Sequence, residues 1–146
     1  MLDNLLSGLF ASVFVAILTI CWERYKTKKK LTGYCLLLYL EVNDHAYRLS
    51  VLDSLCVDSL LNKPDVEWDS CRHFIAANLP YKEFACILEH YRAMQAARKI
   101  LSITGTIPSD FLARYLATSN RALEVLLGRA DLNIEKVQLY NKLRKV

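Results

Sequence analysis

The sequence predicts an all-α protein, with one N-terminal transmembrane helix followed by a cytoplasmic antiparallel bundle of four to five helices. Three observations predict this class. The 146 residues include only 4 Gly and 3 Pro, too few for the tight turns of a β-sandwich or barrel. Apolar residues recur at helical spacing after residue 30. An uncharged, largely apolar run opens the chain. With 53% hydrophobic and 23% charged residues, the composition excludes a disordered chain.

The uncharged run covers residues 4–22. A helix of that length is about 28 Å long, close to the hydrocarbon thickness of a bilayer at about 30 Å. Trp22 and Tyr25 stand where interfacial aromatic residues are expected. Asp3 precedes the run and no small-residue cleavage site follows it, which favours an uncleaved span over a signal peptide. A core helix of a soluble protein is the other interpretation.

A basic cluster follows the run and predicts the orientation of the span. By the positive-inside rule the N-terminus faces outward, and the chain is a single-pass protein of the inner (plasma) membrane with its C-terminal domain in the cytoplasm. Such a cluster also attracts anionic lipid, so the bilayer is an expected partner. Five cysteines without a C-x-x-C pair fit a reducing compartment. The cluster comprises Arg24, Lys26, Lys28, Lys29 and Lys30.

Small residues at a spacing of four mark one face of the predicted span. Gly8, Ser12 and Ala16 form this row. Rows of this kind let membrane helices approach closely, so we expect these residues to mediate association of the span with a second copy or with another protein.

The sequence divides into residues 1–30, the anchor with its basic juxtamembrane segment, and residues 31–146, the bundle. Breaks at Pro64, Pro80 and Gly105 separate the predicted helices, with Asp65 as an N-cap and Gly105 as a C-cap. We expect helices over about residues 31–62, 66–77, 80–103, 109–128 and 133–145.

Four residues are weak candidates for a metal site, because carboxylates and imidazoles on facing bundle helices bind metals. They are Glu41, His45, Glu89 and His90. The Glu-x-x-His pattern of di-iron bundles is absent, and the adjacent Glu89 and His90 point about 100° apart on a helix. The alternative is that His45 is a core histidine bonded to Glu41. We therefore predict no metal, no cofactor and no catalytic residue.

The first bundle helix has a Leu- and Glu-rich sequence, Leu36-Leu37-Leu38-Tyr39-Leu40-Glu41-Val42. With the preceding run and basic cluster, it resembles small uncharacterised bacterial and phage single-span membrane proteins that carry a cytoplasmic helical bundle. Those proteins often have Asn one turn after the Glu, where this chain has His45. The resemblance implies the architecture, and it implies no activity.

The expected function is that of a membrane-anchored bundle acting through protein–protein interaction or self-association. No nucleotide, hydrolase or zinc motif is present, so we predict no enzyme and identify no small-molecule substrate. A nucleic-acid partner is not expected, because residues 31–130 carry no basic excess. Two alternatives stay open: a membrane-acting effector, such as a toxin, phage-defence component or exclusion factor, and a membrane-tethered metal-binding enzyme.

Overall fold

The computed structural model describes residues 2–51, 60–62 and 64–130, with side chains from Phe10 onward. Within these residues the only regular secondary structure is helical, which confirms the all-α prediction. The four helices are α1 (Leu2–Val51), α3 (Val66–Asn78), α4 (Tyr81–Thr104) and α5 (Ser109–Arg129). Residues 60–62 are also helical. The predicted helix over residues 133–145 lies outside the described residues.

The ends of α3, α4 and α5 lie close to the predicted positions, whereas α1 begins and ends before the helix predicted over residues 31–62. Pro80 immediately precedes α4, where its fixed φ suits a helix start. At the other end of α4, Gly105 adopts a φ of 70° and its N–H donates to the carbonyl of Leu101. This left-handed conformation favours glycine, so the predicted C-cap is confirmed.

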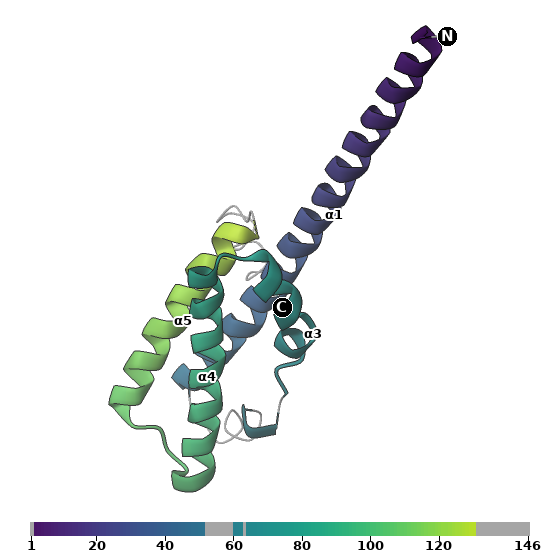
Figure 1. The fold of residues 1–146 in the computed structure, drawn as a ribbon. Helices are drawn as coiled ribbons and strands as arrows, with labels where there is room; N and C mark the ends of the chain where they lie inside the picture. The colour runs from purple at the N-terminus through teal and green to yellow at the C-terminus, as the bar shows by residue number, and fades with distance from the viewer. Residues whose placement is uncertain (1, 52–59, 63, 131–146) are drawn as a thin grey trace, which may run out of the picture.

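α1 is one uninterrupted helix of 50 residues, about 75 Å long at 1.5 Å per residue. Its first half extends well beyond the other helices (Figure 1). Residues 10–30 are exposed, and Leu31 is the first partly buried residue. Gly33 does not interrupt the helix. The predicted domain boundary after residue 30 therefore lies inside α1, at the point where the helix enters the bundle.

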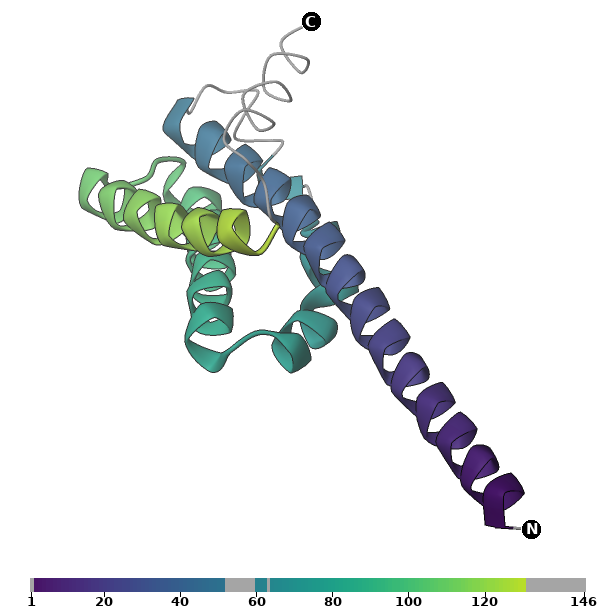
Figure 2. The same cartoon turned by 90° about the horizontal axis from the view of Figure 1, so that it is seen from above.

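The second half of α1 lies against both α5 and α3, and α4 lies against α5 (Figure 2). Apolar residues at helical spacing on the second half of α1 are buried: Cys35, Leu38, Val42 and Leu49. They divide between two clusters. The first joins Cys35, Leu38 and Val42 to α3, α4 and α5, with members Trp68, Cys71, Ile75, Leu79, Ile87, Tyr91, Ala122, Leu126 and Ala130. The second contains Leu49, Leu60, Met94, Ala97, Leu101 and Tyr115.

The predicted transmembrane helix is wrong. Across the part of the chain that the structure describes, no helix has both the length and the apolar content needed to cross a membrane. This finding contradicts the transmembrane part of the predicted fold, the single-pass topology and the inner-membrane localisation.

Candidate functional site

An exposed apolar segment of α1 is the first candidate site. We call residues 10–22 the apolar arm. Its large side chains are solvent-exposed to between 50% and 73%. Consecutive residues on a helix point about 100° apart, so Val13, Phe14 and Val15 already cover more than half of the circumference. The exposed large apolar residues are Phe10, Val13, Phe14, Val15, Ile17, Leu18, Ile20 and Trp22.

The predicted row of small residues falls partly on this arm. Ser12 and Ala16 are exposed and lie one turn apart on α1. The side-chain environment of Gly8 lies outside the described residues. The face bearing Ser12 and Ala16 carries small side chains, so a second backbone could approach the arm closely there.

The predicted basic cluster lies between the arm and the bundle, and all five of its residues are exposed. Lys26 bonds Glu23 at 3.2 Å and stands over the ring of Trp22, which stacks on Tyr25. Lys30 lies 4.8 Å from the centroid of the Phe74 ring and so links α1 to α3. Part of the cluster is thus used in cation–π contacts at the base of the arm.

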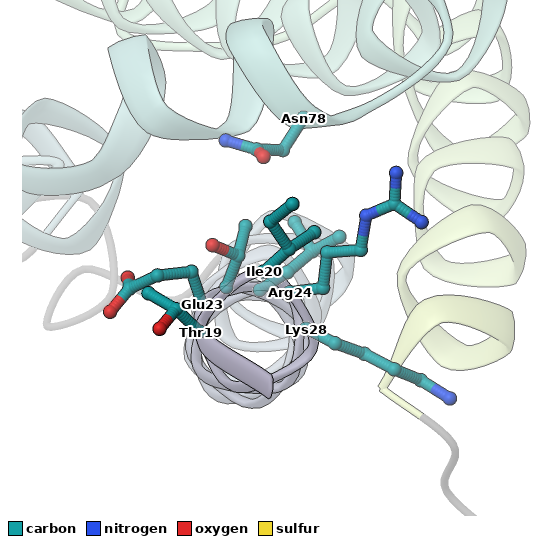
Figure 3. Close-up of a pocket in the computed structure, with 8 residues that line it drawn as sticks. Thr19, Ile20, Glu23, Arg24, Lys28 and Asn78 are labelled. Carbon is teal, nitrogen blue, oxygen red and sulfur yellow. The ribbon is translucent and has the colours of Figure 1, made fainter. Parts of the chain in front are cut away.

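A shallow groove of about 520 Å³ lies where the base of the arm meets the end of α3. In Figure 3, Asn78 faces Ile20 of α1 across this groove, and Glu23 and Arg24 extend to opposite sides of the helix. The groove is lined by Thr19, Ile20, Glu23, Arg24, Thr27, Lys28, Leu31 and Asn78.

A buried polar network in the bundle is the second candidate site. Glu41 stands at its centre on α1. Its carboxylate accepts hydrogen bonds from the backbone N–H groups of Glu67 and Trp68, both at 3.2 Å, and from the hydroxyl of Tyr91 at 2.6 Å. Desolvation raises the pKa of Glu41, and the same desolvation together with the adjacent Glu41 raises the pKa of Tyr91.

Asp65 and Arg98 form a second part of the network. The two guanidinium NH₂ groups of Arg98 bond the two carboxylate oxygens of Asp65 at 2.6 and 2.8 Å, and its Nε donates to the carbonyl of Leu60 at 2.9 Å. Asp65 is 7% exposed, so the pair is largely withdrawn from water. Asp65 does stand at the predicted N-cap position of α3, but its side chain makes no capping bond. Glu41 supplies that cap instead.

A chain of hydrogen bonds joins α1, α4 and α5. His45 Nδ1 lies 3.3 Å from His90 Nε2, and His90 Nδ1 lies 3.0 Å from the Ser119 hydroxyl. Because that hydroxyl donates to the carbonyl of Tyr115, the network assigns a hydrogen to His90 Nδ1 and another to His45 Nδ1. His45 Nε2 lies 3.4 Å from Asp65 Oδ1.

Burial keeps His90 neutral. Desolvation, with the nearby His45 and Arg98, lowers the pKa of His90 to about 3. A carboxylate, imidazoles and a hydroxyl in sequence are also the components of a serine nucleophile. Ser119, however, has no exposed surface, so a substrate cannot reach its hydroxyl. The hydrogen bonds from His45 through His90 to Ser119 thus hold α1, α4 and α5 together.

The structure brings together only part of the predicted metal set. His45 and His90 are in contact, whereas Glu41 bonds α3 and Tyr91, and Glu89 is exposed on α4. Among the described residues, no three His, Cys, Asp or Glu side chains are grouped to hold a metal ion. The alternative prediction that His45 bonds Glu41 is not what the structure shows, since its partners are His90 and Asp65.

The cysteines divide by environment. Burial raises the pKa of Cys35 to about 11 and that of Cys71 to about 12, so both are neutral thiols in the core. Cys21 is exposed on the arm, and Cys86 is partly buried. Cys56 lies outside the described residues.

Sequence reasoning missed the roles of Asp65, Arg98 and Ser119. Arg98 carried a usable signal, because it falls one position from the buried Ala97 on the apolar stripe of α4. A charged residue beside a buried stripe is seldom left without an opposite charge. Ser119 carried no local signal.

The fold and the network define an all-α helical-bundle protein with a projecting apolar helix. Comparisons with protein families, with curated proteins and with solved structures find no match for this chain.

Proposed function

We propose that this protein acts by self-association, with the apolar arms of several copies packed together and the bundles held side by side around them. The exposure of the arm carries this proposal. Eight large apolar side chains within residues 10–22 are each at least half exposed. A helix that is apolar around most of its surface is normally buried against other apolar groups. A contiguous exposed apolar surface of this kind marks an interaction site.

The charge pattern favours a second copy of the same arm as the occupant. Residues 4–22 carry no charge, so two arms can pack without desolvating an ion. In a symmetric pair both copies use the same surface patch for the contact. The face of Ser12 and Ala16 on one copy then packs against the face of Ser12 and Ala16 on the other. The exposed basic residues that follow stay in water and end the contact.

The distribution of the apolar residues favours more than two copies. One neighbouring helix covers a single stripe of its partner. Because Val13, Phe14 and Val15 point in three directions, one neighbour would leave much of the arm in contact with water. An assembly of at least three arms covers the apolar surface more fully.

Cross-linking of the full chain in the cells that express it tests the proposal. Cys21 is replaced by Ser, and Ala16 is replaced by Cys to place one thiol on the small face. With a short bis-maleimide, covalent copies of the 16.8 kDa chain are expected. Arg121, exposed on α5, replaced by Cys in the same background is the matched control and is expected to cross-link weakly.

A pair of charge substitutions completes the test. Phe14→Glu with Leu18→Glu places carboxylates within the packed arms and is expected to abolish cross-linking through residue 16. Arg121→Glu is the control for added negative charge. The proposal is overturned if A16C yields no covalent copies, if its adducts contain a different protein, or if the two glutamates leave the yield unchanged.

A further inference from the structure

We infer that the groove between α3 and α4 is a binding site for a small aromatic anion. Arg72 on α3 and Arg92 on α4 both line this groove, together with apolar and aromatic side chains. This inference does not depend on the proposed self-association, because the groove is on the bundle and the arm takes no part in it.

The local sequence opens the groove. α3 ends at Asn78 and α4 begins at Tyr81, so only Leu79 and Pro80 turn the chain between them. Trp68 fills the space between the two helices and stacks on Tyr91, with ring centroids 4.4 Å apart, and on Phe84, at 6.0 Å. The hydrogen bonds from Tyr91 and from the N–H of Trp68 to Glu41 hold this layer in place.

The size of the groove suits a small molecule. Its volume is about 370 Å³, within the range of about 300–1,000 Å³ that is typical of small-ligand sites. Trp68 and Tyr91 are almost fully buried, so a ligand would lie over the partly exposed Phe84 and Leu88. Aromatic side chains favour a planar aromatic ligand through stacking and edge contacts.

The charge of the groove selects an anion. Of the described residues that line it, none is acidic; they are Trp68, Arg72, His73, Ala76, Phe84, Leu88, Tyr91, Arg92 and Gln95. Arg72 lies 3.7 Å from Asp69, but both side chains are at least half exposed and such surface pairs are weak. Both guanidinium groups are therefore available to bind a sulfonate, carboxylate or phosphate bidentately.

Calorimetric titration of the full chain with naphthalene-1-sulfonate tests the site, and 1-naphthalenemethanol is the uncharged comparison. We expect the sulfonate to bind at least about tenfold more tightly than the alcohol. Arg72→Gln and Arg92→Gln should each weaken sulfonate binding about threefold, and the double variant about tenfold. The exposed Arg121→Gln is the matched control and should leave the affinity unchanged.

The two tryptophans locate the bound probe. Their indole N–H signals are assigned with Trp22→Phe, and the Trp68 signal is expected to shift on titration while that of Trp22 stays. Ala76→Trp, at an exposed position in the groove wall, should block binding without disturbing the core. No binding at about 1 mM probe, unchanged affinity in the double arginine variant, or a shift confined to Trp22 would each overturn the inference.

Discussion

Glu41 and Trp68, 27 positions apart in the chain, are joined by a hydrogen bond of 3.2 Å from the backbone N–H of Trp68 to the Glu41 carboxylate. A side chain of α1 thereby caps the first turn of α3 and fixes where that helix begins. Glu67 gives the carboxylate a second backbone N–H, and Tyr91 gives it a hydroxyl from α4. One carboxylate thus connects three helices.

Replacing Glu41 with Ala should lower the free energy of unfolding by about 2–4 kcal/mol, because the cap of α3 is lost and the buried Tyr91 hydroxyl loses its acceptor. Glu41→Gln retains one carbonyl acceptor and should cost about 1 kcal/mol. Urea denaturation measures both. Glu124→Ala, at an exposed position of α5, is the control. Equal effects of E41A and E124A would contradict the capping role.

Separating Arg98 from Asp65 should be severely destabilising. Arg98→Met leaves the Asp65 carboxylate buried without its bidentate partner, at a cost of about 3–5 kcal/mol. Asp65→Asn with Arg98→Met should recover part of that loss, because no uncompensated charge remains. The exposed Asp69→Asn, which breaks the pair with Arg72, should cost less than about 1 kcal/mol. Thermal unfolding distinguishes the buried pair from the surface pair.

The neutral state of His90 makes stability fall in acid. Its pKa is about 3 in the fold and about 6.5 in the unfolded chain, so below pH 6.5 only the unfolded chain takes up this proton. The resulting loss is about 1.4 kcal/mol per pH unit between about pH 6 and pH 4. The raised pKa of Glu41 acts in the opposite direction, since its folded carboxyl takes up a proton at a higher pH.

Comparison of the wild type with His90→Gln isolates the histidine contribution. The Gln amide can still contact His45 and Ser119, but it does not titrate. The difference in unfolding free energy between the two chains should change with pH by about 1.4 kcal/mol per unit below pH 6. Parallel stability curves from pH 7 to pH 4 would show that His90 is not held neutral.

The glycines offer a paired test of backbone conformation. Gly105 has a φ of 70°, so Gly105→Ala should cost about 1–2 kcal/mol. Gly33 lies within α1, with nothing near the position of an added Cβ, so Gly33→Ala should stabilise the protein by about 0.5–1 kcal/mol. Opposite signs of the two changes in melting temperature are expected. Stabilisation by G105A would refute the left-handed cap.

Local patterns were sufficient to predict α3, α4 and α5. The apolar spacing after residue 30 predicted helices, and Gly105 predicted the end of α4. Both features depend on residues within a few turns of each other. The uncharged run and the row of Ser12 and Ala16 also drew attention to the segment that contains the apolar arm. The membrane-spanning role predicted for that segment is contradicted.

The polar network could not be predicted in the same way. Asp65 has the residue type and position of an N-cap, but it bonds Arg98, 33 positions later, while the cap comes from Glu41, 26 positions before Glu67. Such partners are set by how the helices pack, which the spacing along one helix does not reveal. The contact of His45 with His90 rather than Glu41 has the same cause.

Because α1 is one continuous helix, the apolar arm and the buried network are mechanically connected. The same rigid helix carries the apolar arm at one end and Glu41 and His45 at the other, with no hinge at Gly33. The arm and these side chains therefore belong to one continuous backbone. A displacement of the arm can thus reach the cap of α3 and the histidine pair through the backbone of α1 alone.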